Sequence, residues 1–281
     1  MGGMPAHHFT VDVEEYFQVA ALESVVPRAE WSQRDSRLEG SLRLLLDLLA
    51  EAGARGTFFV LGWIAERHPA LVRAIADAGH EIGSHGWDHR RVTDQAPVQF
   101  RESVRSTRDL LEQLVGGPVA GFRAPSFSIV PGHEWALDIL VEEGYRYDSS
   151  LFPIRRPGGR YGYPDSPVDP YWLRRPPGPL AELPPATLSF GGWRIPAGGG
   201  GYFRLFPYAL TSAALRACER RNMPGTFYIH PWELDPDQPR LPVSCLTRIR
   251  HYTGLAQTRQ KLQRLLREFR FTTMAETVSW L

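Results

Sequence analysis

Apolar residues along the chain form two kinds of pattern, which alternate with each other. In one pattern they recur at helical spacing, as Leu42, Leu45 and Leu49 do in the first predicted helix. In the other they form short runs rich in strand-forming residues. Strands that alternate with helices predict parallel strands joined by helical crossovers. The expected strands are residues 9–13, 57–61, 81–84, 121–123 and 226–230, and the expected helices are residues 38–52, 69–78, 98–114, 134–143, 208–220 and 257–269.

Candidate reactive side chains follow several of the strand-like runs. Asp12, His85, Arg123 and Asp148 each stand at such a position. Parallel strands with helical crossovers form either an open α/β sheet or a barrel. In a barrel the carboxyl ends of all strands share one rim, where catalytic groups collect. The pattern therefore indicates that these side chains meet at one edge of the fold.

Residues 153–185 interrupt the alternation, because they are rich in Pro, Gly, Arg and Tyr and show no period. A loop of this length without regular structure is uncommon inside a compact domain and usually has a function. We therefore interpret residues 153–185 as an insertion at the rim of a single domain that comprises residues 1–281, and not as a linker between two domains.

Two histidines and an acidic cluster form a candidate metal site. His85 and His89 are four residues apart, so in a helix or a turn of similar pitch their imidazoles can share one metal ion. A zinc site with two histidines needs a third protein ligand, commonly a carboxylate, and a free position for water. Asp12 and Glu14 face the same side of a strand while Glu15 faces elsewhere, so one can bind metal and the other can accept a proton from water. Taken alone, these patterns also fit surface histidines and a solvated acidic strand end.

An arginine and a third histidine complete the candidate set. Arg123 in reach of Asp12 would keep that carboxylate ionised and oriented through charge and paired N–H donors. His230 ends an apolar strand, where a lone histidine is more often a structural residue. As a general acid it would protonate a leaving amine, and a nearby carboxylate would raise its pKa for that role.

Composition narrows the classes of function. Of the 281 residues 43% are hydrophobic and 22% charged, and the formal net charge is +1, so the strong basic excess typical of a nucleic-acid-binding protein is missing. The two cysteines, Cys218 and Cys245, exclude a disulfide scaffold and a multi-cysteine metal site. No apolar run is long enough for a membrane-spanning helix, and residues 1–8 lack the pattern of a secretory signal, so we expect a cytoplasmic protein.

The order of these segments along the chain resembles that of the polysaccharide deacetylases of the NodB-homology type, carbohydrate esterase family four. The resemblance covers most of residues 7–232 and includes residues 57–60 (Thr-Phe-Phe-Val) and 79–82 (Gly-His-Glu-Ile) beside the catalytic segments.

Three further segments resemble one branch of this family, which is encoded beside exosortase-linked exopolysaccharide loci. They are residues 11–18 (Val-Asp-Val-Glu-Glu-Tyr-Phe-Gln), 59–62 (Phe-Val-Leu-Gly) and 250–252 (Arg-His-Tyr). This branch has an additional C-terminal segment, which here would be about residues 235–281.

The resemblance implies a fold and a set of roles. The fold would be a distorted (β/α) barrel, expected to have seven strands, with a C-terminal helical extension. A divalent metal, expected to be Zn2+, would be bound by three residues. In the commonest motif of the family two aspartates are adjacent, whereas this chain has Asp-Val-Glu. Glu14 is therefore assigned as the third ligand, with Glu15 as its alternative. The family's aspartate that orients the acid histidine has no clean match, and Asp148 is the candidate. The implied roles are Asp12 as base, Arg123 as its tether, His230 as acid, Glu14, His85 and His89 as metal ligands, and Pro125, Ile229 and Trp232 as substrate contacts, with the backbone N–H after Pro125 stabilising the oxyanion.

The reaction implied by the resemblance is metal-dependent removal of N-acetyl groups from an N-acetylated exopolysaccharide, with release of acetate. Aromatic residues that could stack on sugar rings, or simply belong to the core and loops, are Trp87, Tyr161, Tyr163, Tyr171 and Trp172. Two alternatives stay open. One is the same fold acting on a peptidoglycan sugar, a formamido sugar or a small cyclic ureide, and the other is an inactive carbohydrate-binding protein.

Overall fold

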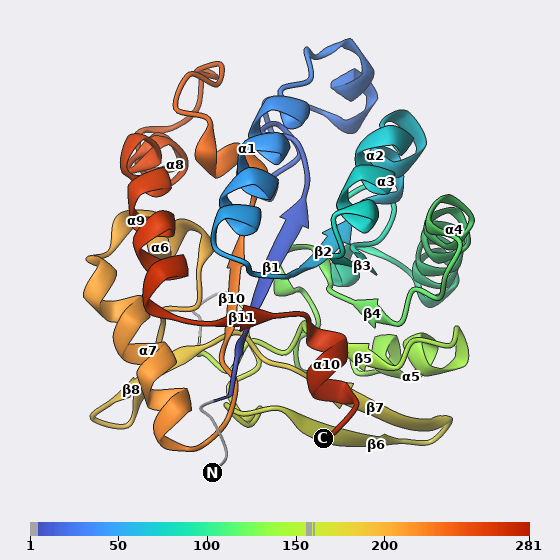
Figure 1. The fold of residues 1–281 in the computed structure, drawn as a ribbon. Helices are drawn as coiled ribbons and strands as arrows, with labels where there is room; N and C mark the ends of the chain where they lie inside the picture. Colours follow the sequence, from blue (N-terminus) through green and yellow to red (C-terminus); the bar gives the residue numbers. More distant parts are fainter. Residues whose placement is uncertain (1–4, 156–158, 160) are drawn as a thin grey trace.

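The computed structural model describes residues 5–155, 159 and 161–281, which form a mixed α/β fold (Figure 1). The strands are β1 (His7–Val13), β2 (Thr57–Val60), β3 (Glu81–Ser84), β4 (Gly121–Phe122), β5 (Tyr147–Asp148), β6 (Tyr171–Arg175), β7 (Gly178–Glu182), β8 (Thr187–Phe190), β9 (Trp193–Pro196), β10 (Thr226–Ile229) and β11 (Phe271–Thr272). The helices are α1 (Leu38–Glu51), α2 (Gly62–Arg67), α3 (Pro69–Asp77), α4 (Pro97–Val115), α5 (Trp135–Glu142), α6 (Gly200–Leu205), α7 (Tyr208–Arg220), α8 (Cys245–Tyr252), α9 (Leu255–Glu268) and α10 (Met274–Val278).

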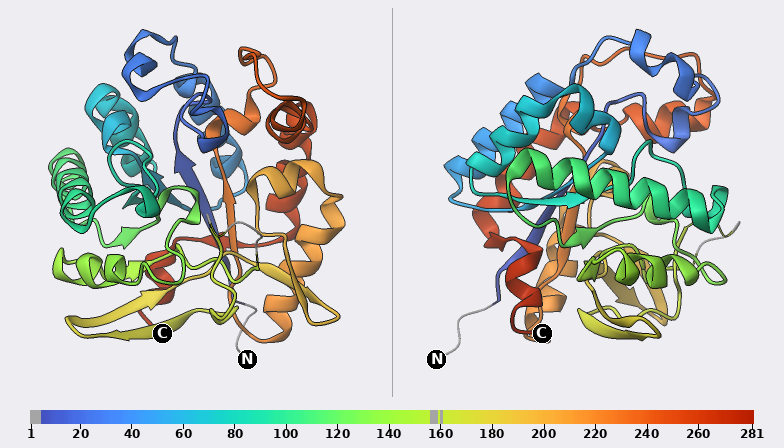
Figure 2. Two further views of the ribbon diagram at one scale, coloured as in Figure 1. Left: turned by 180° about the vertical axis from the view of Figure 1, so that it is seen from behind. Right: turned by 90° about the vertical axis from the view of Figure 1, so that its right-hand side faces the viewer.

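A curled sheet in the order β10-β1-β2-β3-β4-β5-β7-β6 forms the centre of the molecule. Within the described residues, the seven strands from β10 to β7 are parallel to their neighbours, and β6 adds an antiparallel edge. Beyond β7, Pro185 forms an isolated parallel bridge with Thr226 of β10, so the two sides of the curled sheet approach each other. The longer helices lie around the outside of the sheet (Figure 2). The predicted distorted (β/α) barrel is confirmed.

The strand β1 is buried along its whole length, and its two faces carry different kinds of side chain. Phe9, Val11 and Val13 belong to the main hydrophobic core. The alternate residues Thr10 and Asp12 instead contact a buried arginine inside the barrel. Because side chains alternate along a strand, a single pattern anchors β1 in the core and delivers a carboxylate to its other face.

Two strands lie in the segment 153–185, which the sequence predicted to be irregular. They are β6 and β7, and β7 pairs in parallel with β5 in the central sheet. Its sequence begins with Gly178 and Pro179, which hide a strand from pattern analysis, but Leu180 and Ala181 are fully buried. Tertiary packing, and not local propensity, therefore holds this strand in place. Residues 156–158 and 160 of the predicted insertion lie outside the described residues.

A run of glycines at residues 198–201 lets α6 pack directly against β10. The Tyr228 N–H donates to the Gly198 backbone oxygen at 2.8 Å. Gly199 has a φ of 142°, and a Cβ at this position would lie 1.9 Å from the Tyr228 backbone oxygen. Only glycine allows so close an approach of two backbones, and this approach sets the position of α6 beside the end of β10.

The C-terminal segment from about residue 235 packs onto the same body. Its strand β11 pairs in parallel with His7 and His8 of β1, and Leu262 and Leu265 of α9 belong to the main core. Among the helices of the described residues, none is both long and apolar enough to cross a membrane.

Candidate active site

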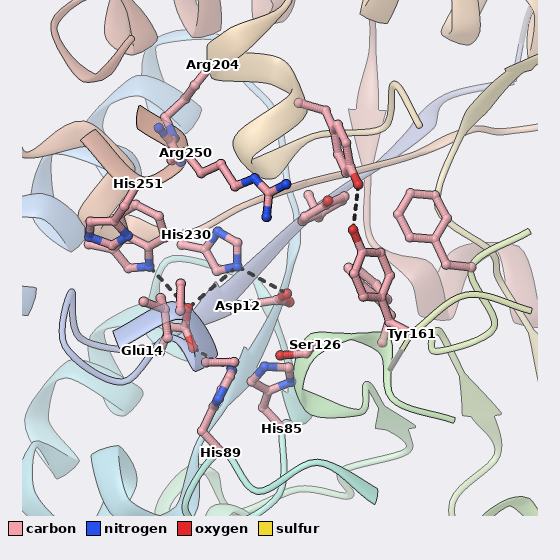
Figure 3. A pocket seen from close by; sticks show the side chains of 18 residues that line it. Asp12, Glu14, His85, His89, Ser126, Tyr161, Arg204, His230, Arg250 and His251 are labelled. Carbon is pink, nitrogen blue, oxygen red and sulfur yellow. Dashed lines mark hydrogen bonds and ion pairs between the residues drawn. The ribbon is translucent and has the colours of Figure 1, made fainter. Parts of the chain in front are cut away.

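A pocket opens where β1, β3 and β10 end (Figure 3). The predicted site residues that line it are Asp12, Glu14, His85, His89, His230 and Trp232. The other described residues of its lining are Val19, Ala20, Ala21, Ser126, Phe127, Phe152, Tyr161, Tyr202, Arg204, Tyr228, Arg250 and His251. The carboxyl ends of the parallel strands thus meet at one site, as the strand pattern indicated.

Two imidazoles and one carboxylate converge in this pocket. Ligand atoms of Glu14, His85 and His89 all lie within 4.8 Å of one another, and the three side chains are buried. His85 Nδ1 lies 2.7 Å from the backbone oxygen of Arg123. Because a carbonyl oxygen can only accept, Nδ1 carries the proton and Nε2 keeps its lone pair. Burial lowers the pKa of His85 to about 4, so the ring is neutral near pH 7, which is the form that binds metals.

The two histidines do not share a helix. They belong to the loop after β3, in which His89 adopts a left-handed backbone conformation with a φ of 56°. This turn brings the centroids of the His85 and His89 rings to 5.5 Å. Of the two geometries that the four-residue spacing allowed, the chain uses the turn.

Glu14 completes the set of donor atoms. Its Oε1 accepts a hydrogen bond from Trp232 Nε1 at 3.1 Å, which orients the carboxylate. Its Oε2 lies 2.8 Å from His89 Nε2 but is buried without a hydrogen bond of good geometry among the described residues. Burial would raise the pKa of Glu14, but the surrounding histidines hold it at about 2, so the group is ionised.

The residues present fit a divalent metal. A buried carboxylate oxygen that lacks a well-formed hydrogen bond and two imidazole nitrogens are the usual three protein ligands of a catalytic zinc site. Glu15 does not take part, because its carboxylate accepts hydrogen bonds from the Ser36 hydroxyl and the Arg37 N–H on the other side of the chain. The geometry therefore favours Glu14 over Glu15 as the third ligand.

Arg123 is fully buried and holds Asp12 from one side. Its Nη1 donates to Asp12 Oδ1 and to Thr10 Oγ1, both at 2.7 Å. Its Nη2 donates to Ser149 Oγ at 2.9 Å, and its Nε to the Ser149 backbone oxygen at 3.3 Å. The contact between Arg123 and Asp12 uses one nitrogen and not the expected two. Asp12 Oδ2 lies 3.8 Å from His230 Nε2 within the pocket.

His230 is held by a buried chain of charged groups. Its Nδ1 lies 2.8 Å from Glu233 Oε2, and Glu233 Oε1 accepts a hydrogen bond from Arg204 Nε at 2.5 Å. The other nitrogens of Arg204 donate to two backbone oxygens at the end of α8, at 2.7 and 2.9 Å. Burial opposes a charge on His230, but the carboxylates of Glu233, Glu14 and Asp12 outweigh it and raise the pKa of His230 to about 9. The imidazole is therefore protonated at neutral pH.

The assignment of Asp148 as the residue that orients His230 is wrong. Asp148 does not line the pocket, and its Oδ1 accepts a hydrogen bond from Ser150 Oγ at 2.5 Å. Glu233 takes that position, and it also accepts a hydrogen bond from the His230 backbone N–H at 3.0 Å. The sequence contains a signal for this contact. His230 precedes the short 3-10 helix η5 (Pro231–Leu234), and a carboxylate at the third position of a helix commonly folds back onto the residue that caps the helix.

Two predicted substrate contacts do not line the pocket. Ile229 is fully buried in the main core, because side chains alternate along β10 and it is Tyr228 and His230 that line the pocket. Pro125 is buried and does not line the pocket, whereas the next residue, Ser126, lines it and has a φ of 57°. The predicted oxyanion donor, the N–H after Pro125, belongs to Ser126 and stays a candidate.

Trp232 lines the pocket, but its polar atom is already used by Glu14. Its ring stacks between those of His230 and His251, with centroid distances of 5.2 and 4.5 Å. Trp232 therefore positions the acid and a metal-ligand candidate at the same time. Among the aromatic residues proposed to stack on sugars, only Tyr161 is part of the described lining, and its hydroxyl lies 2.7 Å from that of Tyr202.

Replacing Glu233 by Gln should lower the pKa of His230. The carboxylate favours the charged imidazolium, so its loss makes the proton easier to release, and the alkaline limb of the kcat–pH profile should move to lower pH. The variant leaves the buried Arg204 without its carboxylate, which typically costs about 3–5 kcal/mol, so the profile is measured on protein shown to be folded.

An NMR titration of His230 gives an independent readout of the same change. Asp148→Asn is the matched control. Asp148 is also a buried carboxylate at the end of a strand, but it does not contact His230. If the alkaline limb of the kcat–pH profile moved in Asp148→Asn and stayed in place in Glu233→Gln, the assignment of Glu233 as the partner of His230 would be contradicted.

Comparisons with known proteins match two segments of the chain to family models. Residues 35–146 match the family model described as polysaccharide deacetylase, and residues 149–279 match a domain of unknown function (DUF3473). A peptidoglycan deacetylase-like protein of Gibberella zeae is 35% identical over 112 residues, which are 40% of this chain and 32% of that protein. A peptidoglycan-N-acetylglucosamine deacetylase of Bacillus cereus is 32% identical over 95 residues, or 34% of each chain. The chain thus covers about a third of the length of these curated relatives.

The fold comparison extends over the whole chain. A crystal structure from Mycobacterium smegmatis, assigned as a polysaccharide deacetylase, has a TM-score of 0.66 at 20% identity and covers 99% of this chain and 92% of its own, which shows a shared fold. His85 and His89 lie in the segment that matches the deacetylase model, Asp12 and Glu14 precede it, and His230 lies in the second segment. Residues 35–146 therefore belong to the polysaccharide deacetylase family, and residues 149–279, which complete the same barrel, match a domain of unknown function.

Proposed function

We propose that the protein hydrolyses N-acetyl groups of an N-acetylated polysaccharide, an exopolysaccharide, in a metal-dependent reaction that releases acetate. The observation that carries this proposal is the meeting of three groups in one pocket. They are the donor set of Glu14, His85 and His89, the Asp12 carboxylate, and the protonated His230. A carbohydrate-binding protein without activity would have no use for a buried base and a half-buried acid whose nearest atoms lie 3.8 Å apart.

The proposed metal would be held by Glu14, His85 and His89, and the mixture of imidazole nitrogens and one carboxylate suits Zn2+. A divalent metal bound there supplies two effects: it polarises an amide carbonyl and makes a water molecule more acidic. The Trp232 N–H and the Arg123 backbone oxygen fix the orientation of two of the ligands, as outer partners of metal ligands commonly do.

The protein's own groups then divide the proton transfers. Asp12 takes one proton from the attacking water, while Arg123 fixes the position of its other oxygen. His230 Nε2 delivers a proton to the amide nitrogen as the bond between that nitrogen and the acetyl carbon breaks. Glu233 keeps the imidazolium in place through Nδ1, so Nε2 faces the reaction. The N–H of Ser126 would stabilise the developing oxyanion, and the products are acetate and the free amine.

The test is acetate release from a panel of substrates. The panel comprises N-acetylglucosamine oligomers, an acetylated exopolysaccharide and peptidoglycan, each assayed after removal of metals by a chelator and again after addition of Zn2+. We expect acetate from the N-acetylated oligomers, with activity lost on chelation and restored by Zn2+. Binding of the oligomers without acetate release under any condition would contradict the proposal.

Peptidoglycan is a second candidate substrate, because the Bacillus cereus relative is named as a peptidoglycan-N-acetylglucosamine deacetylase. Acetate release from peptidoglycan at a higher kcat/KM than from the exopolysaccharide would favour it.

A further inference from the structure

One arginine of the pocket makes no polar contact with its side chain. Arg250 belongs to α8 and lines the pocket together with His230 and Asp12. In Figure 3 its guanidinium points into the pocket. Over residues 5–155, 159 and 161–281, the guanidinium forms no hydrogen bond or ion pair, and only the Arg250 backbone oxygen is used.

The other two arginines at the site differ from Arg250. Arg123 and Arg204 are buried, and every nitrogen of each guanidinium donates a hydrogen bond inside the protein. Their charges are therefore part of the fold and of the catalytic geometry. Among the described residues, the guanidinium of Arg250 pairs with no acidic or hydrogen-bonding group, and it faces the place where a substrate would lie.

The backbone that carries Arg250 is held rigidly next to the acid. Arg204 donates from Nη2 to the Arg250 backbone oxygen at 2.9 Å, while its Nε donates to Glu233, the partner of His230. The next residue, His251, is buried, stacks on Trp232 and has its Nε2 3.0 Å from Gln238 Oε1. The start of the Arg250 side chain is thus fixed relative to the proton donor, which lowers the entropy that the arginine loses when it binds a ligand.

We propose that Arg250 recognises an anionic group of the glycan, a carboxylate or a phosphate, next to the N-acetylated sugar. This inference rests on the proposed deacetylase function and narrows its substrate class to acidic N-acetylated glycans. A planar guanidinium fork suits both anions and can bind them through two hydrogen bonds. Arg250 lines the same pocket as Asp12 and His230, so an anionic group bound by its guanidinium would lie close to the N-acetyl group that reacts. A cation placed there favours an acidic glycan over a neutral one.

The experiment compares three proteins on three substrates. The proteins are the wild type, Arg250→Gln, and the matched control Arg248→Gln, which removes an exposed arginine of the same helix that does not line the pocket. The substrates are a neutral N-acetylglucosamine tetramer, a tetramer in which N-acetylglucosamine alternates with glucuronate, and N-acetylglucosamine 1-phosphate. For each combination of protein and substrate, KM and kcat are measured by acetate release, and affinity is measured separately by calorimetry.

The wild type should prefer an anionic substrate over the neutral tetramer. In Arg250→Gln this preference in KM and in affinity should fall by about 10- to 100-fold, the usual range for losing a charge-assisted hydrogen bond, while kcat changes little. Arg248→Gln should keep the preference. The substrate whose binding depends on Arg250 shows which anionic group the arginine recognises. This group is either a uronate within the glycan or a phosphate at its end.

Two outcomes would overturn the inference: equal losses on neutral and anionic substrates, or no preference in the wild type. The proposed function is scored separately by acetate release from the neutral tetramer. Calorimetry measures the dependence on Arg250 even if no substrate is turned over, so a failure of one proposal is distinguishable from a failure of the other.

Discussion

In its folded fraction, an Asp12→Asn protein should bind metal and lose about 10²- to 10⁴-fold in kcat, the range that a positioned general base contributes. The amide has almost the shape of the carboxylate, and its oxygen can still accept the hydrogen bond that Arg123 Nη1 donates. What it cannot do is take a proton from water. The measurement is kcat by acetate release, with metal content determined on the same sample.

The comparison requires a second buried carboxylate that has no part in the chemistry. Asp148→Asn provides it, since Asp148 is fully buried, ends the strand β5 and does not line the pocket. Its kcat should stay close to that of the wild type in the folded fraction. Near-normal turnover in Asp12→Asn would exclude Asp12 as the base, whatever the result for Asp148.

Loss of either Glu14 or His89 should abolish tight metal binding and, with it, activity. In a site with three protein ligands, removal of one should weaken binding by more than the roughly 10- to 100-fold that loss of an outer partner costs. The variants are Glu14→Gln, which keeps the size of the side chain, and His89→Ala. Metal affinity is measured by competition with a chromophoric chelator, and the rise in melting temperature on addition of Zn2+ should disappear as well.

Glu15→Gln is the control for this pair, because Glu15 is adjacent in sequence, equally buried, and bonded to Ser36 and Arg37 instead of facing the pocket. It should bind metal as the wild type does, although the loss of one of the two hydrogen bonds accepted by the carboxylate should lower its melting temperature. Tight stoichiometric binding in His89→Ala would refute the ligand set. Loss of metal in Glu15→Gln, with retention in Glu14→Gln, would move the third ligand to Glu15.

Much of the fold and part of the site could be predicted from the sequence, because both depend on local patterns. The strand ends that carry Asp12 and His85 are marked by apolar runs that stop at a polar residue. The period of two along β1 placed Asp12 and Glu14 on one side of the chain, and both now line one pocket. The same rule, applied to β10, would have excluded Ile229 from the pocket, since its neighbours Tyr228 and His230 line it.

Other features depend on contacts between distant parts of the chain. The strand β7 begins with Gly-Pro and is held by β5 and β6, so no local preference reveals it. Arg204 reaches Glu233 only because the glycines before α6 let that helix approach β10. In the same way, Arg250 reaches the pocket through the packing of α8, which no spacing along the chain indicates. These residues belong to the site through tertiary structure alone.

The strand β1 has consequences for how this protein can be divided or recombined. It pairs with β2 from the segment that matches the deacetylase model, and with β10 and β11 from the segment that follows. A recombinant fragment that stopped at residue 146 would leave one side of β1 as a bare edge of apolar residues, which is a site for aggregation. Chimeras that exchange segments between relatives would have to transfer β10 and β11 together with β1, so the smallest unit that can be inherited or engineered intact is the complete barrel.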